Sequence, residues 1–307
     1  MVHSGVGEDD LRKLTGALPE PARSVPTVRP PGSGPGNWAG SPSAVLDGAD
    51  IVLAYRLRRP AGAGRGHAVA VARSRDGVRF ETIQTITKDQ VDAESLERPA
   101  LAVTADGTWR LHLSCATRGT KHWRVELLEA PAPDRFNPRR RSVLLAGDQT
   151  RAVKDPVIRW HGGKWHLWAC IHPLADPDAT DRMWTEYASS AHGLDWTWHG
   201  PALQPRPGQW DGRGVRVTDI WFTPGGVLAH YDGRASAAEN FEERTGIAFG
   251  PVPGELTAVG TAPAAQSLAA GRGLRYLSIL RLPDGRERLY YELTRADGAH
   301  ELVTELR

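Results

Sequence analysis

Three acidic side chains stand where strands are expected to begin, and together they could perform acid–base chemistry. Glu97 lies two residues before a proline, Asp155 lies directly before one, and Asp219 opens an apolar run. Proline fixes the backbone at the start of a strand, so the residue before it can project toward a common axis. Carboxyl groups in different environments take different pKa values and can divide the roles of acid and base, as in glycoside hydrolysis. In an alternative interpretation these acids only pair with nearby cations and hold the fold together; those cations are Arg98, Arg151, Lys154 and Arg216.

A repeated unit is expected to position these acids. Each copy has a short apolar strand, a tight turn with glycine and a second strand that ends at Tyr or Cys; the turn glycines are Gly48, Gly107, Gly163, Gly226 and Gly285. The turns are 56 to 63 residues apart, and the strand ends keep nearly the same period. Because Asp-Gly and Gly-Gly supply the positive φ that two-residue hairpin turns need, each unit is predicted to begin with a β-hairpin.

Further strands are predicted within each period. The apolar run that ends at Ala72 and the run 185–189 each precede a Gly-containing turn and are typical of a third strand. Three or four strands per period predict an all-β fold, a five-bladed β-propeller over residues 37–307. Five equal periods argue against the alternative of a β-sandwich. Residues 1–36 are rich in Pro and Gly, and we expect an irregular N-terminal arm or a segment that helps close the last blade onto the first.

The Asp155-Pro156 pair, the five periods and the acids on successive strands resemble the five-bladed glycosidase superfamily. This superfamily includes the arabinanase and β-xylosidase family, the invertase-like enzymes and the mannoside phosphorylases, and the resemblance covers residues 37–307. It implies a first-blade carboxylate as base or nucleophile, an orienting Asp and an acid from another blade. Asp155 matches the orienting acid, and Asp219 lies near the position of the general acid. Ser41 stands where the family has its first-blade Asp, and a Ser hydroxyl cannot by itself act as a base near neutral pH.

Aromatic and polar side chains near the expected site suit a sugar, whose C–H faces stack on aromatic rings. The tryptophans that flank the site-facing segments are Trp38, Trp123, Trp184 and Trp221, whereas Trp165 and Trp168 alternate along a strand and are predicted to pack in the core. The polar segment 231–246 offers hydrogen bonds to hydroxyls, or else forms a short solvated helix over 237–244. From this segment and the strand ends, the candidate binding residues are Ser41, Arg56, Arg98, His122, Asp232, Arg234, Glu242 and Glu243.

Hydrolysis of a small glycoside or oligosaccharide, such as a furanoside, is the leading functional hypothesis, with Glu97 in place of the missing first-blade acid. Phosphorolysis is a second hypothesis, because several cations could bind phosphate: Arg56, Arg58, Arg98, Arg118, Lys121 and His122. A non-catalytic propeller that binds a sugar or another metabolite is the third. Ser41 favours this binding role, whereas the acids at the other strand starts favour an enzyme.

The amino-acid composition argues against nucleic acid and membranes as partners. The 38 basic and 36 acidic residues are interspersed and give a net charge of +2, which gives no case for binding nucleic acid. No apolar run is long enough to span a membrane, and the N-terminus lacks the features of a secretory signal. Cys115 and Cys170 lie in apolar runs and are expected to be buried free thiols, which indicates a cytoplasmic protein. The histidine spacing indicates no metal site, although a calcium ion at the centre of the channel is left open by the sequence. No cofactor is expected, and the sequence does not predict an oligomeric state.

Overall fold

The computed structural model describes residues 18–307, so the first 17 residues of the predicted arm lie outside the described part. Three antiparallel sheets have four strands each. They comprise β6 (Leu96–Val103), β7 (Trp109–Ala116), β8 (Trp123–Ala130) and β9 (Ser142–Leu145); β10 (Arg151–His161), β11 (Lys164–Pro173), β12 (Trp184–Ser190) and β13 (Thr197–Leu203); and β14 (Gly214–Thr223), β15 (Gly226–Arg234), β16 (Arg244–Gly250) and β17 (Thr257–Val259).

The remaining strands form an eight-stranded sheet. It comprises β1 (Val25–Val28), β2 (Trp38–Asp47), β3 (Asp50–Arg58), β4 (Gly66–Ser74), β5 (Glu81–Thr87), β18 (Leu274–Arg281), β19 (Glu287–Thr294) and β20 (His300–Leu306). The strands β2–β5 and the strands β18–β20 are linked by one parallel pair, Trp38 with His300. These pairings confirm an all-β fold with four-stranded sheets of the kind found in propellers.

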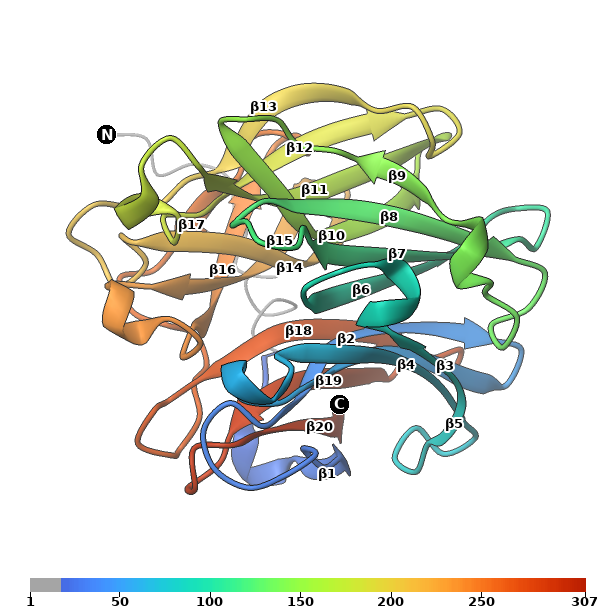
Figure 1. Ribbon diagram of the computed structural model, residues 1–307. Coiled ribbons are helices and arrows are strands. Elements are labelled where there is room, and N and C mark those ends of the chain that lie inside the picture. Colours follow the sequence, from blue (N-terminus) through green and yellow to red (C-terminus); the bar gives the residue numbers. More distant parts are fainter. Residues whose placement is uncertain (1–17) are drawn as a thin grey trace.

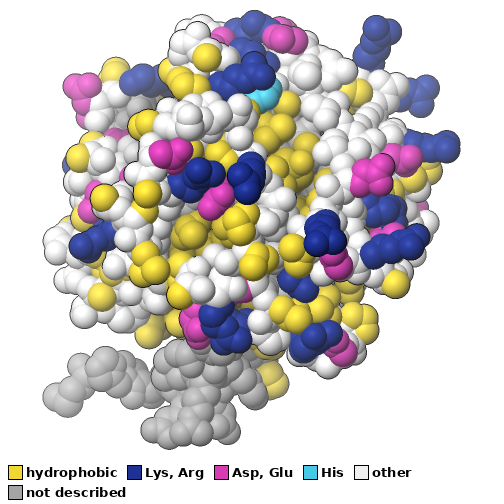
Figure 2. All heavy atoms as spheres, turned by 90° about the horizontal axis from the view of Figure 1, so that it is seen from below, with side chains coloured by type: hydrophobic (Ala, Val, Ile, Leu, Met, Phe, Trp, Pro, Cys, Tyr) yellow, Lys and Arg dark blue, Asp and Glu magenta, His cyan; other side chains and the backbone are white. Residues whose placement is uncertain are grey.

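Short 3-10 helices connect the strands; they are η1 (Pro21–Arg23), η2 (Ala61–Ala63), η3 (Lys88–Val91), η4 (Pro138–Arg140), η5 (Pro177–Ala179) and η6 (Ala237–Glu239). The helix considered over 237–244 is therefore reduced to η6, because β16 already begins at Arg244. Within the described residues, no helix is long and apolar enough to cross a membrane. On the face drawn in Figure 2, acidic and basic side chains are interspersed.

The predicted hairpins are present, and the third strands are β4 and β12. The β2–β3 turn closes at the pair Asp47–Asp50, and Gly48 takes the positive φ of +62° that this turn requires. β1 pairs with the C-terminal strand β20 and lies beside it in Figure 1. β1 belongs to the residues assigned to the arm, and a domain boundary at residue 36 stays a prediction.

The first strand of each repeat has one interruption of its register. The interruptions fall at Ser41–Pro42 in β2, Glu97–Arg98 in β6, Asp155–Pro156 in β10, Thr218 in β14 and Tyr276–Leu277 in β18. Ser41, Asp155 and Tyr276 have φ near +55°, which is uncommon for residues other than glycine. A β-bulge re-aims the side chains beside it, so these five bulges decide what faces the centre of the molecule.

The core lies between neighbouring sheets. Trp165 and Trp168 are buried there, as the alternating pattern predicts, and Trp168 donates its indole N–H to the Pro253 carbonyl at 2.8 Å. Cys115 and Cys170 are buried free thiols, and burial raises the pKa of both well above the usual range.

Candidate functional site

A small, partly open pocket of about 30 Å³ lies where the first strands begin, and we call it the central pocket. Its lining comes from many strands and two loops: Trp38, Arg56, Glu97, Lys154, His172, Met183, Arg216, Arg234, Asn240, Phe241, Glu243, Arg275 and Tyr276. Most of these side chains are buried and charged. A pocket built from several separate strands brings together side chains that are far apart in sequence.

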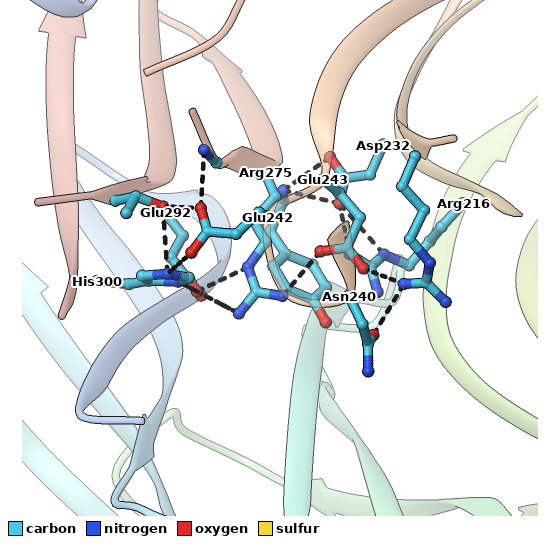
Figure 3. Close-up of polar contacts among 12 residues, drawn as sticks. Arg216, Asp232, Asn240, Glu242, Glu243, Arg275, Glu292 and His300 are labelled. Atoms are coloured by element: carbon cyan, nitrogen blue, oxygen red, sulfur yellow. Dashed lines mark hydrogen bonds and ion pairs between the residues drawn. The ribbon is translucent and has the colours of Figure 1, made fainter. Parts of the chain in front are cut away.

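Ion pairs form a continuous row along one wall of this pocket. Glu97 accepts hydrogen bonds from Arg56 at 2.8 Å and Arg58 at 3.0 Å. Arg56 also pairs with Glu292. Arg275 Nη2 lies 2.6 Å from the other carboxylate oxygen of Glu292. Figure 3 shows Arg275 between Glu292 on one side and Glu243 on the other, and its Nη1 donates to Glu243 at 2.9 Å.

The row ends at Arg234, which pairs with the second oxygen of Glu243. The cations and acids thus alternate from Arg58 to Arg234, with one more guanidinium than carboxylate. Glycine is required at position 40 of β2, because a Cβ there would lie 2.0 Å from Glu292 Oε2. The lack of a side chain at Gly40 therefore gives Glu292 room to reach its partners.

A second group of ion pairs closes the other wall. Arg216 donates to Asp155 at 3.1 Å and to Asp232 at 2.6 Å. Lys154 Nζ lies 3.5 Å from Asp155, and the Tyr276 backbone N–H lies 3.1 Å from both oxygens of Asp232. Asp155 of β10, Arg216 of β14 and the Tyr276 backbone of β18 are therefore joined through Asp232 and Arg216 in one group of contacts.

The Tyr276 ring lies among four guanidinium groups. The Arg216 guanidinium carbon lies 3.8 Å from the ring centre, Arg275 lies at 5.2 Å, and Arg56 and Arg98 lie at 5.8 Å. The electron-rich face of an aromatic ring attracts cations, and more strongly where water is excluded. This ring therefore separates cations that would otherwise repel one another.

The carboxyl groups of the site fall into two sets, those whose pKa is lowered and one whose pKa is raised. Burial acts to raise the pKa of Glu97, Asp155, Glu243 and Glu292, but their cationic neighbours together outweigh burial and hold each pKa below its ordinary value. In Asp232 burial prevails over Arg216, and the pKa rises to about 6. The pocket thus holds ionised carboxylates beside one group that takes up a proton at mildly acidic pH.

His300 joins the row of ion pairs to a polar loop. Its Nδ1 lies 2.7 Å from Glu292, and its Nε2 lies 3.1 Å from Glu242 (Figure 3). The Trp38 ring stacks on His300 with 4.8 Å between centroids, and the guanidinium of Arg58 lies over the Trp38 ring at 4.4 Å. Trp38 is thus enclosed by cations and imidazole in this structure.

Eight of the residues proposed from sequence come together at this site. Trp38, Arg56, Glu97, Arg234 and Glu243 line the central pocket. Asp155, Asp232 and Glu242 lie in the ion pairs and hydrogen bonds directly behind its lining.

Ser41 and Arg98 are buried beside the site without lining the pocket. The Ser41 hydroxyl has no hydrogen-bond partner among residues 18–307. Arg98 donates to the backbone carbonyls of Val217 and Thr218, so it ties β6 to the bulge of β14. Both side chains lie at the register interruptions of β2 and β6, but Arg98 reaches the backbone of β14 in a different sheet.

Other proposed residues do not line the central pocket. His122 contacts the Thr117 hydroxyl, and the ring of Trp123 lies 4.7 Å from Lys154 Nζ. Trp184 packs against a core cluster and donates to Glu186. The cations Arg118 and Lys121, considered for phosphate, are exposed; Arg118 pairs with Asp89 and Asp92, and Lys121 donates to the Pro177 carbonyl.

Asp219 and Trp221 lie in a different cavity, of about 250 Å³, which we call the second cavity. Its lining is Arg159, Trp160, His161, Asp219, Ile220, Trp221, Phe222, His230, Ile279 and Arg281. Asp219 accepts hydrogen bonds from Arg159 and from the Ile279 backbone N–H, both at 2.5 Å. The structure does not bring Asp219 to Glu97 and Asp155, because it follows the bulge of β14 instead of occupying it.

Sequence reasoning missed Arg275, Tyr276, Glu292 and His300. The first two form the fifth strand start, and comparison of Arg275-Tyr276 with Lys154-Asp155 would have revealed them. Glu292 directly follows Tyr291, the end of the last predicted strand, at the position that Arg56 occupies after Tyr55. No local pattern marks His300. In the described part of the chain, no group of three or more His, Cys, Asp or Glu residues is arranged to hold a metal ion.

No protein-family model matches this sequence, and no curated protein matches it either. Solved structures do match. The structure of BT0996 in an RGII complex has a TM-score of 0.74 at 10% identity, with 98% of this chain and 95% of the BT0996 chain covered. A thermostable family-43 glycoside hydrolase has a TM-score of 0.68 at 13% identity, with 87% and 88% covered.

The β-1,2-mannobiose phosphorylase from Listeria innocua, in complex with β-1,2-mannobiose, has a TM-score of 0.66 at 16% identity. The match covers 94% of this chain and 95% of the phosphorylase. At these identities the similarity concerns the fold. It confirms the resemblance expected from the repeats: the chain has the fold shared by family-43-like glycoside hydrolases and mannoside phosphorylases.

Proposed function

We propose that this protein is an enzyme that cleaves a glycosidic bond at the central pocket of a five-bladed β-propeller. The blade count follows from dividing the eight-stranded sheet at the single pair Trp38–His300. This division gives one blade of β2–β5 and one of β18–β20 with β1, beside the three four-stranded sheets. The five register interruptions, one in each first strand, support the same count.

One observation carries the proposal of hydrolysis: two carboxylates from distant parts of the chain, Glu97 and Glu243, line the same pocket. Their cationic neighbours keep both ionised at neutral pH, which suits the base or nucleophile of glycoside hydrolysis. Asp155 contacts Arg216 and orients it. The folds of the similar structures, glycoside hydrolases among them, support this assignment.

Asp232 is our candidate for the source of the proton. Among these acids only Asp232 has a pKa above its ordinary value, at about 6, and a general acid works best with a pKa near the operating pH. Asp232 is fully buried behind Arg216 and Tyr276, both of which line the pocket. Access to the substrate therefore requires these two side chains to move.

Aryl pyranosides and furanosides with a panel of neutral oligosaccharides, assayed without phosphate, test hydrolysis. We expect turnover that falls at least 100-fold in Glu97→Gln and Glu243→Gln. Glu81→Gln, an exposed acid on β5, is the matched control and is expected to keep full activity. Turnover that survives in both pocket variants contradicts the assignment. Sugar binding without turnover in any assay points to the non-catalytic role that Ser41 suggested.

Phosphorolysis is the second candidate, favoured by an excess of cations. Five cations line the central pocket, Arg56, Lys154, Arg216, Arg234 and Arg275, against the two carboxylates Glu97 and Glu243. A phosphate that bound Arg234 and Arg275 would compete with Glu243 for them and thereby raise the pKa of that carboxyl toward its ordinary value. Turnover that requires added phosphate would select this candidate.

We also propose the cytoplasm as the site of action. The buried thiols of Cys115 and Cys170 support it, since a reducing compartment keeps cysteines unpaired.

A further inference from the structure

The second cavity uses the same first strands as the central pocket, at their other ends. β14 carries Arg216 in the central pocket and Trp221 in the second cavity. These residues are five positions apart, or about 16 Å at the rise of a β-strand. β10 and β18 repeat this division, with Lys154 and Arg159 on one strand and Arg275 and Arg281 on the other. The two sites are therefore built on shared strands but are spatially separate.

A buried imidazole in this second cavity has no partner. His230, on β15 opposite Asp219, is 4% exposed and lines the cavity. Its Nε2 is buried and makes no hydrogen bond to any residue of the described range. Burial lowers the pKa of His230 although Asp219 acts to raise it, so the ring is neutral at pH 7. A neutral imidazole nitrogen can donate or accept one hydrogen bond, and a hydroxyl can serve as its partner in either role.

Aromatic rings line the same cavity as His230. His161 and Phe222 stack with 3.9 Å between centroids and an interplanar angle of 5°. Trp160 is 54% exposed although it is a large apolar side chain, and its ring meets the edge of Trp165. Trp160 also lines a neighbouring cavity of about 670 Å³. An exposed tryptophan between two cavities offers a face on which the C–H surface of a sugar can stack.

The charged groups of the second cavity neutralise one another. Arg159 binds Asp219, and Arg281 lies over the Trp221 ring and pairs with Glu287 at 3.3 Å. An anion would have to separate these pairs, whereas a neutral polyhydroxylated ligand can use His230 and the aromatic rings without doing so. Pockets with apolar aromatic walls and a few directed polar groups are typical of small-molecule sites.

We propose that the second cavity is a binding site for a neutral saccharide. A sugar ring stacks on Trp160 and places a hydroxyl against His230 Nε2, and a longer chain continues across Trp160 into the neighbouring cavity. This site binds without cleaving and is distinct from the central pocket. Its existence does not depend on which reaction, if any, the central pocket performs.

Isothermal titration calorimetry with xylotetraose, arabinotetraose, mannotetraose and β-1,2-mannobiose tests this site. The protein variants are Trp160→Ala, His230→Phe, Glu243→Gln in the central pocket, and Leu268→Ala as an exposed apolar control. We expect at least one probe to bind wild type, Glu243→Gln and Leu268→Ala equally. The same probe should bind at least tenfold more weakly to Trp160→Ala and His230→Phe.

Two results would overturn the proposal. One is that no probe binds the wild type; the other is that binding disappears in Glu243→Gln but persists in Trp160→Ala, which would assign the sugar to the central pocket alone. His230 and Glu243 are both buried, so their variants need a thermal melt to show that they fold. Trp160 is exposed, and its substitution decides the matter by itself where His230→Phe is unstable.

Discussion

The central pocket and the second cavity show two ways of using the same strands. The central pocket is about 30 Å³ and filled by its own ion pairs, whereas the second cavity is about 250 Å³ and walled by aromatic rings. In the first, each charged side chain of the lining has an oppositely charged partner, although single atoms such as Asp155 Oδ1, Arg56 Nε and Arg234 Nε make no hydrogen bond within residues 18–307. In the second, a buried nitrogen of His230 has no partner within residues 18–307. A ligand that binds a charged side chain of the central pocket must therefore compete with an ion pair, whereas a ligand that binds His230 Nε2 displaces no protein contact of that atom.

This difference has an energetic consequence. Buried charges are tolerated when they are paired, and removal of one partner leaves an unpaired charge that costs several kcal/mol. The side chains of the central pocket consequently support the fold as well as any reaction. In the second cavity Trp160 and Arg281 are more exposed, whereas Asp219 is buried and bonded to Arg159 and to the Ile279 backbone. Substitutions at the two sites should therefore affect stability very differently.

The largest expected effect separates the two sites by catalysis. Glu97→Gln or Glu243→Gln should lower kcat/KM by about 10²–10⁴-fold, the usual contribution of an acid–base group. Asp219→Asn should change it by less than about threefold, because Asp219 lines the second cavity. Steady-state kinetics on the best substrate of the glycoside panel measure both. A loss in Asp219→Asn as large as in Glu243→Gln would instead restore the assignment of Asp219 as general acid.

The second prediction compares two arginines of β18. Arg275 pairs with Glu243 and Glu292, and all three side chains are at most 2% exposed. Arg275→Met should lower the free energy of unfolding by about 3–5 kcal/mol, because two carboxylates lose a buried partner. Arg281, which is 48% exposed, pairs with Glu287, and Arg281→Met should cost about 0–1 kcal/mol. Urea denaturation measures both values, and equal costs would show that the central ion pairs are not a structural unit.

How far the sequence predicts these sites depends on the kind of signal. The hairpins repeat along the chain, and the glycine in each turn marks a backbone conformation that adjacent residues alone determine. The sheets were therefore predictable from the sequence. The strand start at Asp155-Pro156 was predictable because proline marks it, whereas the bulge there was not predicted. What the sequence could not show was the direction of each bulge, since Glu97, Arg98 and Asp219 all lie near strand starts but reach different neighbours.

The partners of the ion pairs were hidden for a different reason. Glu292 and Arg56 are separated by 236 residues, and they meet only because the strands β3 and β19 are brought around the same centre. Charge pairing at such distances in sequence has no periodic signature. The second cavity was likewise unforeseen, although Asp219 and Trp221 were both chosen, because the two were assigned to a single site.

The third prediction uses pH, and the two sites should respond with opposite sign. The folded state holds the Asp232 pKa near 6, above the ordinary 3.8, so its contribution to stability is present below about pH 4 and is lost as pH rises through 6. Burial lowers the pKa of His230, so its contribution is present above the ordinary 6.5 and is lost as pH falls. Thermal melts of wild type, Asp232→Asn and His230→Phe between pH 4 and 8 measure the two differences.

Relative to Asp232→Asn, the wild type should lose stability as pH rises from 4 to 6. Relative to His230→Phe, it should lose stability as pH falls below 6.5. The acids paired with arginine, Glu97 and Glu243 among them, add a separate loss as pH falls below their ordinary values, and this loss is common to all three proteins. Parallel curves for the wild type and Asp232→Asn would show that Asp232 titrates normally and cannot supply the proton.

The smallest expected effect belongs to Trp160, and Trp38 is its counterpart in the central pocket. Trp160 is 54% exposed, so Trp160→Ala should change the free energy of unfolding by less than about 0.5 kcal/mol. Trp38 is buried against His300, and Trp38→Ala should cost about 3–5 kcal/mol. Urea denaturation of both variants checks the contrast. If Trp160→Ala proved equally costly, its exposed ring would be a structural element, and a loss of saccharide binding in that variant would no longer identify a stacking surface.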